Sequence, residues 1–268
     1  MSIAGLTADF KTTGLSNTVF HLEETGSTNA DAMARATAGE PLPFWVTAQR
    51  QTAGRGRSGR EWLSAPGNLY ASLALGLQCD QQTASQLSLV AGVAMMDALR
   101  AVSAAQPAAQ IGEMFLKWPN DIMTGRGCDA AKLGGILIQT THDHGSERLL
   151  VVVGFGLNIC AAPEINRNVT HLSALHFQVT SLAVYEALSY AMTAALAVWD
   201  EGNGFYKIRA RWLEQATPIR TMMRINTGVT LADGFFAGLD ADGAMVMTDD
   251  FGHNRRFTFG DVELQSAS

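Results

Sequence analysis

The chain has 268 residues, of which 47% are hydrophobic, 16% are charged and seven are prolines. This composition is typical of a folded globular chain, and the length allows one large domain with a small appendage but excludes a large multidomain assembly. The 19 basic and 25 acidic residues leave a net charge of −6, which excludes a general attraction to polyanions, so we expect neither nucleic acid nor a membrane surface as a partner.

The first four fifths of the chain carry mixed strand and helix signals. A strand over residues 19–23 leads, through capping residues Ser27, Thr28 and Asn29, into a helix over residues 30–38. Apolar residues at helical spacing predict a long helix that includes residues 87–98. Further strands are predicted over residues 44–48, 69–77, 115–118, 133–140 and 149–155, and further helices over residues 181–199 and 205–214. These signals predict an α+β domain.

The pattern changes after Pro218 to short β-rich runs separated by turn residues. Turns are predicted at Asp233-Gly234 and at Asp242-Gly243. The runs cover residues 221–225, 229–239, 244–248 and 255–259. We therefore predict a small β-barrel at the C-terminus, with domains over residues 1–217 and 218–268.

A polar loop over residues 49–67 separates two of the predicted strands, and its residues 54–60 read GRGRSGR. Loops of this length inside a compact domain are usually functional. Arg55, Arg57 and Arg60 carry planar guanidinium groups suited to phosphate or carboxylate oxygens, on a glycine-rich backbone that can approach a ligand closely. The alternatives are a solvated basic loop and a patch that contacts RNA.

Two further motifs end or begin strands with polar residues. KWPND, residues 117–121, ends a strand at Pro119 and leaves Asn120 and Asp121 at the rim of a sheet. KLGGIL, residues 132–137, begins a strand with Lys132 and then removes side chains on both faces. In the alternative readings Asp121 is a turn residue and the glycines mark a β-bulge.

GFGLN, residues 154–158, again combines strand glycines with a polar residue, Asn158. Trp62, beside the arginine loop, is suited either to stacking on a planar ring or to filling the core. We find no pattern for a covalent nucleophile, so these motifs favour positioning and charge neutralisation.

The three cysteines are far apart and form no C-x-x-C pair, which argues against a disulfide framework and a cysteine zinc site. There is no secretory signal pattern and no run of 18 apolar residues. We expect a cytoplasmic protein.

Taken in order, ETGSTN (24–29), QTA (51–53) followed by GRGRSGR, then KWPND, KLGGIL and GFGLN resemble the motifs of a biotin protein ligase. The resemblance extends over residues 19–160, and the small β-rich domain follows two helices. It implies a mixed-sheet catalytic domain of the biotin/lipoate ligase type with an SH3-like C-terminal barrel. No DNA-binding domain is expected ahead of the first strand, so a repressor role is not expected.

The resemblance also implies a two-step reaction. Biotin and ATP, with Mg²⁺, give biotinyl-5′-AMP, and a lysine of a biotin carboxyl carrier protein then takes the biotinyl group; a homodimer is possible by analogy. The implied catalytic residues are Lys132, Arg55, Arg57 and Asp121. The implied biotin-binding residues are Ser27, Thr28, Asn29, Gln51, Arg55, Gly56, Arg57, Lys132 and Gly135. The implied ATP- and adenylate-binding residues are Arg55, Arg57, Arg60, Trp62, Asn120, Lys132 and Asn158. No residue is assigned to a metal.

Three alternatives remain open at this point. A lipoate or octanoate ligase shares the chemistry, but its pocket should be apolar, whereas Ser27, Thr28, Asn29 and Gln51 favour a polar ligand. A nucleic-acid-binding module built on the RGR loop conflicts with the net charge of −6. A catalytically inactive biotin-binding protein is disfavoured because the loop arginines, Lys132 and Asp121 are all present.

Overall fold

The computed structural model describes residues 18–143 and 148–265, so the expectation of a loosely tied N-terminal arm lies outside the described residues. Two sheets organise the described chain. A seven-stranded sheet is formed by residues between Val19 and Leu157, and a five-stranded sheet by residues between Met222 and Leu264. The expected combination of mixed sheet and helices is confirmed.

The seven-stranded sheet has the order β1-β2-β3-β7-β6-β5-β4. Strands β1 and β2 are parallel, and all other neighbours are antiparallel. The strands are β1 (Val19–Thr25), β2 (Phe44–Gln51), β3 (Leu69–Leu77), β4 (Met114–Lys117), β5 (Asp121–Thr124), β6 (Ala131–His142) and β7 (Leu149–Leu157). The predicted strand over residues 69–77 is confirmed at both ends, whereas the short strand β5 was not predicted.

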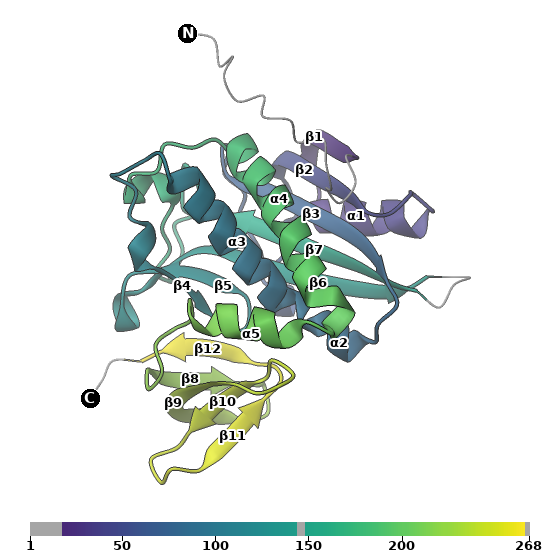
Figure 1. Ribbon diagram of the computed structural model, residues 1–268. Helices are drawn as coiled ribbons and strands as arrows, with labels where there is room; N and C mark the ends of the chain where they lie inside the picture. Colours follow the sequence, from purple (N-terminus) through teal and green to yellow (C-terminus); the bar gives the residue numbers. More distant parts are fainter. Residues whose placement is uncertain (1–17, 144–147, 266–268) are drawn as a thin grey trace.

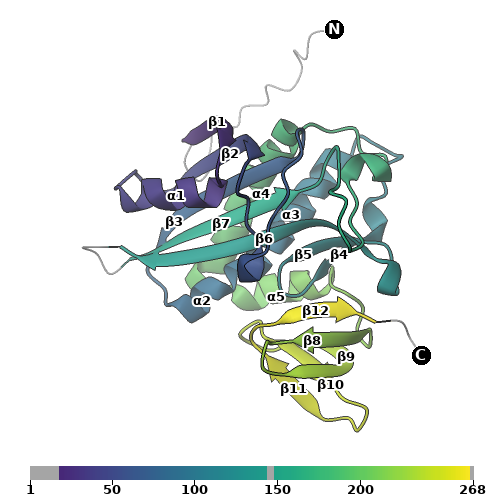
Figure 2. The ribbon, with the colours of Figure 1, turned by 180° about the vertical axis from the view of Figure 1, so that it is seen from behind.

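Helices cover both faces of this sheet (Figures 1 and 2). Because side chains alternate along a strand, Phe44 and Val46 of β2 face α1, where they pack with Ala32, while Trp45 points into the core on the other face. That second face is covered by α3 and α4. The helices are α1 (Thr28–Thr37), α2 (Gln81–Ser85), α3 (Leu87–Ser103), α4 (Ser181–Trp199) and α5 (Phe205–Leu213). Short 3₁₀ turns are η1 (Arg57–Gly59), η2 (Ile111–Glu113), η3 (Gly127–Asp129), η4 (Leu172–Leu175) and η5 (Asp200–Gly202).

Helix α4 is the one described helix whose length and composition would suffice to cross a membrane. Its Val184, Leu188 and Met192 are fully buried against the rest of the fold. Repeats of four residues place these three side chains on one face of the helix. We therefore describe α4 as a core helix that packs on α3 and the sheet.

The C-terminal sheet has the order β11-β10-β9-β8-β12. Its strands are β8 (Met222–Asn226), β9 (Leu231–Leu239), β10 (Met245–Thr248), β11 (Asn254–Phe257) and β12 (Asp261–Leu264). The turn predicted at Asp233-Gly234 is wrong, because β9 runs through both residues in register with β8; the turn at Asp242-Gly243 is confirmed, with Gly243 at φ +91°. Strand β12 was not predicted. The barrel itself stays a prediction, since no pairing between β11 and β12 is seen among the described residues.

The two sheets share one continuous hydrophobic core, which includes Trp212 of α5 and Phe236 of β9. Backbone hydrogen bonds also tie β4 to the segment that precedes the second sheet: Leu116 donates to Gln215 and accepts from Thr217. The C-terminal sheet is therefore fixed against the end of the larger sheet that carries β4 and β5 (Figure 1).

Candidate functional site

The motifs singled out from the sequence converge at one end of the seven-stranded sheet. Gln51 ends β2, Lys132 and Gly135 lie at the start of β6, and Asn158 follows the end of β7. Because β2 and β7 run opposite to β6, these residues meet at the same edge. The loop over residues 52–68 returns across this edge, on the α1 face that Figure 2 shows.

The start of α1 is bound to Gln51 rather than capped by its own residues. Gln51 Oε1 accepts from the Thr28 backbone N–H at 2.9 Å and lies 3.1 Å from Thr28 Oγ1. Ser27 is the N-cap residue, yet its side chain makes no capping hydrogen bond, and the helix begins at Thr28. Ser27 is at the N-cap as predicted, but the helix begins two residues earlier than predicted, and the side-chain acceptor comes from Gln51 of the neighbouring strand.

Asn29 is buried and its amide is bonded within the protein. Its Nδ2 donates to Leu137 O at 3.3 Å and to Gln139 Oε1 at 2.9 Å, and Ser72 Oγ lies 2.6 Å from its Oδ1. Ser72 Oγ is also 2.8 Å from Thr28 Oγ1. Asn29 Oδ1 can only accept, so Ser72 donates to it. In this structure Asn29 is bonded to Ser72, which in turn lies beside Thr28.

Glycines on the sheet make two slots for side chains. A Cβ on Gly154 would lie 2.0 Å from Asn29 Oδ1, and one on Gly156 would lie 2.6 Å from the Trp62 ring. Gly135 is paired with Gly156 on the next strand, and a Cβ added to it would lie 3.1 Å from Lys132 Nζ and 3.5 Å from the Trp62 ring. The Trp62 indole N–H is buried and has no partner among the described residues. The strand glycines thus seat α1 and the loop against the sheet.

The arginine loop forms a tight turn closed by its own backbone. Gly56 N–H donates to Arg60 O at 2.7 Å, and Trp62 N–H donates to Gly54 O at 2.9 Å. The turn passes through Ser58 and Gly59 at φ +55° and +73°.

The three arginines have different surroundings. Arg57 donates to Asn120 Oδ1 and to Gly260 O, each at 3.3 Å, and its burial lowers its pKa against the opposing effect of nearby Asp261. Arg60 forms an ion pair with Asp261 of β12. Arg55 is exposed. Two of the loop cations are therefore held by the C-terminal sheet.

Asp121 lies between two lysines. Lys117 Nζ is 2.9 Å from Asp121 Oδ2, and Lys132 Nζ is bonded to Asp121 Oδ1. Burial alone would raise the pKa of Asp121, but the two lysines together hold it well below its usual value. Asp121 is therefore ionised at neutral pH. Lys132 Nζ also lies 5.6 Å from the centre of the Trp62 ring.

The two asparagines assigned to nucleotide binding are both bonded within the protein. Asn120 Nδ2 donates to Ile136 O at 2.6 Å, while its Oδ1 accepts from Arg57. Asn158 is buried and its Nδ2 donates to Thr170 O at 3.1 Å. In this structure they hold the loop and the end of β7, respectively.

The described residues contain no group of three or more histidine, cysteine, aspartate or glutamate side chains placed to hold a metal ion. Asp121, the carboxylate central to the site, is already bonded to two cations. The donor set among the described residues therefore does not fit a metal site built by these residues alone.

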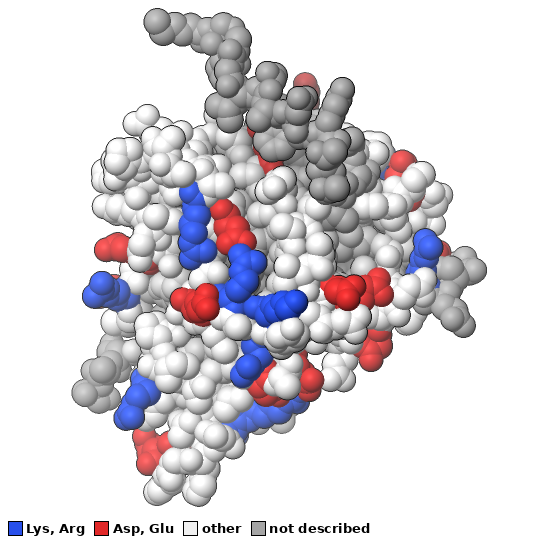
Figure 3. Space-filling view, in the orientation of Figure 1, with Lys and Arg blue, Asp and Glu red and all other residues white. Residues whose placement is uncertain are grey.

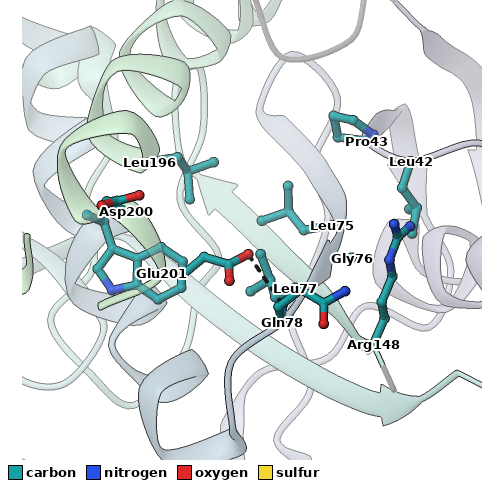
Figure 4. Close-up of a pocket in the computed structure, with 11 residues that line it drawn as sticks. Leu42, Pro43, Leu75, Gly76, Leu77, Gln78, Arg148, Leu196, Asp200 and Glu201 are labelled. Atoms are coloured by element: carbon teal, nitrogen blue, oxygen red, sulfur yellow. Dashed lines mark hydrogen bonds between the residues drawn. The ribbon is translucent and has the colours of Figure 1, made fainter. Parts of the chain in front are cut away.

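A separate pocket of about 370 Å³ lies at the opposite ends of β2 and β3 (Figure 4). Its floor is formed by Leu75, Leu77 and Leu196, and Glu201 at its side accepts from the Gln78 N–H at 3.3 Å. None of the residues assigned from the sequence lines it. We therefore keep the polar edge of the sheet as the candidate site.

Sequence reasoning missed three parts of this site: Ser72, Lys117 as a partner of Asp121, and the backbone of residues 260–262. A usable signal existed for Lys117. Lys117 and Asp121 flank a three-residue turn, which places them opposite each other if residues 121–124 form a strand. No sequence signal pointed to residues 260–262.

Comparisons with known proteins were made on the sequence and on the fold. The model of the Biotin/lipoate A/B protein ligase family matches residues 27–158. A biotin--[acetyl-CoA-carboxylase] ligase of Paracoccus denitrificans is 34% identical over 232 residues, which cover 84% of this chain and 92% of that protein. The bifunctional ligase/repressor BirA of Escherichia coli is 30% identical over 226 residues, covering 82% of this chain and 66% of BirA.

Among solved structures, the biotin protein ligase of Aquifex aeolicus in complex with biotin and ATP matches with a TM-score of 0.75 at 23% identity, covering 94% of this chain and all of that chain. This likeness confirms the fold. The 34% identity to the Paracoccus ligase over nearly its whole length, and the match of the family model to residues 27–158, which hold all the motifs singled out from the sequence except Glu24, Thr25 and Gly26, lead to one assignment. This chain belongs to the Biotin/lipoate A/B protein ligase family.

Proposed function

We propose that this protein is an ATP-dependent ligase that joins biotin to a lysine of a biotin carboxyl carrier protein through biotinyl-5′-AMP. The biotin carboxylate attacks the α-phosphate of ATP and releases pyrophosphate. The lysine amine then attacks the biotinyl carbonyl carbon and releases AMP. One observation carries the proposal: a neutral hydrogen-bonding group, Thr28 with Gln51, lies at the same sheet edge as Lys132 and the arginine loop.

The neutral part of the site suits the ureido ring of biotin, which is polar but uncharged. Ser27, Thr28 and Gln51 offer hydroxyl and amide groups, and Gly135 leaves backbone accessible beside them. Asn29 supports this pocket through Ser72 and Thr28. We propose these residues, with the backbone of Gly56, as the biotin pocket.

The cationic part of the site suits the phosphates. An anionic carboxylate that attacks an anionic phosphate needs positive charge where the two meet. Arg55, Arg57 and Lys132 supply it to the reacting carboxylate and α-phosphate, and Arg60 supplies it to the nucleotide. Trp62 offers a ring face to the adenine, and Asn120 and Asn158 position the segments beside it.

Asp121 is proposed to face the incoming acceptor lysine. The carboxylate is ionised, since its pKa is held low by Lys117 and Lys132, and it can orient the ammonium group and accept its proton. We propose that Mg²⁺ enters together with ATP, because this ion prefers oxygen ligands such as those of the phosphates. No step of the reaction is assigned to it.

The remaining features of the proposal concern the whole chain. Residues 1–217 form the catalytic domain and residues 218–268 a small β-barrel. We propose that the protein is cytoplasmic and does not bind DNA, and a homodimer is proposed by analogy alone. On the face shown in Figure 3, basic and acidic side chains are interspersed and form no continuous basic surface, which disfavours a nucleic-acid interface there.

The proposal is tested by pyrophosphate release from ATP and Mg²⁺ with biotin and, in parallel, with lipoate. We expect release with biotin only, and a biotinyl mass increment on an added carrier domain. Release with lipoate alone would establish the lipoate ligase. Folded protein that releases pyrophosphate with neither acid would exclude a ligase.

The role of Lys132 is tested with Lys132→Ala. Removing this cation leaves the attacking carboxylate and the α-phosphate less neutralised, so we expect pyrophosphate release to slow by about 100-fold. Circular dichroism and thermal unfolding check that the variant folds. Release at the wild-type rate would refute the assigned role.

A further inference from the structure

Each oxygen of the Asp121 carboxylate has its own lysine. Lys117 reaches Oδ2 from β4, at 2.9 Å, and Lys132 reaches Oδ1 from β6. Asp121 itself is only 14% exposed, so water provides little of its solvation. The proposed function assigns Lys132 to the phosphate, so we compare the surroundings of the two lysines.

The two lysines differ in how firmly they are held. The Lys117 ammonium also donates to Val262 O of β12 at 2.8 Å, and its side chain is 13% exposed. Lys132 is 25% exposed and lies beside the open edge near Trp62, where the phosphate is proposed to bind. Lys117 therefore has the additional backbone partner and the smaller exposure, which favour it as the lysine that stays in place.

If Lys132 moved away, the buried Asp121 carboxylate would lose one of the two cations that balance its negative charge. The charged groups that face Asp121 are Lys117 from β4, Lys132 from β6 and, farther off, Arg57 from the loop, whose own charge is offset by Asp261. Without a close cation, burial would favour the protonated acid. A protonated acid cannot accept a proton from an ammonium group.

We propose that Lys117 is a positioning residue, a fixed counter-ion that keeps Asp121 ionised after Lys132 moves to the bound phosphate, so that Asp121 can deprotonate the acceptor lysine. This inference rests on the proposed function. The ammonium of the acceptor gives one proton to Asp121. The resulting amine forms the C–N bond to the biotinyl carbonyl as the C–O bond to phosphate breaks, and the remaining proton lost by the nitrogen leaves with AMP.

A purely structural role for Lys117, fastening β12 to β4, is the competing explanation. Lys117→Met removes both the charge and the hydrogen bonds, whereas Lys117→Arg keeps a cation. Arg209 of α5 donates to Leu239 O of β9 at 3.0 Å, another contact between the two parts of the chain. Arg209→Met is therefore a matched control, which loosens the C-terminal sheet without touching Asp121.

The experiment measures adenylation and transfer separately in each full-length variant. Adenylation is followed as biotin-dependent pyrophosphate release. Transfer is followed by adding preformed biotinyl-AMP, first with a carrier domain and then with hydroxylamine, which is uncharged in neutral solution and needs no base. The pH profile of transfer to the carrier domain is recorded for each variant.

For Lys117→Met we expect the ratio of transfer to adenylation to fall by about tenfold or more at neutral pH. The acid limb of the transfer profile should move to higher pH, because Asp121 then stays protonated over more of the range. Transfer to hydroxylamine should keep the wild-type rate, Lys117→Arg should restore the ratio, and Arg209→Met should leave it unchanged.

An unchanged ratio and an unshifted acid limb in Lys117→Met would overturn the proposal. Equal losses with the carrier lysine and with hydroxylamine would also overturn it, in favour of the structural role. The failure of the proposed function looks different, because the wild-type protein would then release no pyrophosphate with biotin.

Discussion

Gly154→Ala tests whether the glycines of β7 are needed so that α1 can pack closely against the sheet. A Cβ at this position would lie 2.0 Å from Asn29 Oδ1 and 2.7 Å from its Cγ, so the buried amide must move. Moving it breaks the contacts of Asn29 with Ser72, Leu137 and Gln139. Gly76→Ala is the matched control, because its Cβ would meet the flexible end of Leu42 at 3.1 Å.

The expected cost follows from three contributions. Overpacking in a core costs about 1–3 kcal/mol, and the loss of three side-chain hydrogen bonds, at roughly 0.7 kcal/mol each, adds about 2 kcal/mol. The alanine removes conformational entropy from the unfolded chain and returns about 0.5–1 kcal/mol. We therefore expect Gly154→Ala to destabilise the protein by about 3 kcal/mol, a fall in Tm of roughly 6–12 °C, and Gly76→Ala to change stability by about 0.5 kcal/mol at most.

Urea unfolding of the single and double variants is the assay. In an Asn29→Ala background the overlap disappears, so adding Gly154→Ala should cost almost nothing, and the double-mutant cycle should give a coupling energy of about 2–3 kcal/mol. If Gly154→Ala lowers the free energy of unfolding equally in the wild-type and the Asn29→Ala backgrounds, then residue 154 is not a glycine in order to make room for Asn29.

Two further predictions concern the charges and acceptors of the site. Gln51→Glu keeps the acceptor for the Thr28 N–H at the start of α1 but loses the amide donor. The free energy of unfolding should therefore change by less than about 0.5 kcal/mol, while the KM for biotin rises. If urea unfolding showed a loss of stability as large as the loss of biotin binding, this prediction would be contradicted. Asp121→Asn should lower stability at neutral pH by about 2–4 kcal/mol, because two largely buried lysines lose their counter-ion. The folded-state pKa of Asp121 lies below its unfolded value, so its stabilisation is complete above the unfolded pKa of about 4 and is lost as pH falls through the folded pKa. A wild-type advantage over Asp121→Asn that grows on acidification, in urea titrations between about pH 3 and pH 7, would refute the assignment.

The sequence predicted the bounds of an element correctly where the hydrophobic pattern of that single strand or helix was long enough to show its periodicity. The alternating small and apolar residues of 69–77 and the helical spacing of 181–199 gave β3 and α4 at their observed bounds. The strand over residues 121–124 was missed because Pro119 reads as a stop, and four residues are too short for periodicity to show. At residues 233–234, Asp-Gly reads as a hairpin turn, but pairing with β8 outweighs the local preference.

The motifs located the candidate site but not the bonds within it. Residue type alone made Thr28, Asn29 and Gln51 equivalent polar groups. Only the register of β3 with β7, which brings Ser72 opposite Gly154, separates Asn29 as a supporting residue from Thr28 and Gln51 at the edge. Such a distinction depends on contacts between residues more than forty positions apart, which a single sequence does not encode locally.

The C-terminal sheet matters to the candidate site because it contacts the positive charges that we propose the reaction uses. Arg57 is bonded to Gly260 O, Arg60 to the Asp261 carboxylate, and Lys117 to Val262 O, so three cations from two motifs meet one three-residue segment. Arg60 is bonded directly to the Asp261 carboxylate, whereas Arg57 is bonded to a carbonyl oxygen and feels Asp261 only through its nearby charge. Under the proposed function the nucleotide therefore competes with a carboxylate more directly for Arg60 than for Arg57. Substitutions at Asp261 should accordingly act on nucleotide affinity, and substitutions at Lys117 on transfer, so that contacts made by two neighbouring residues of β12 would affect the two half-reactions.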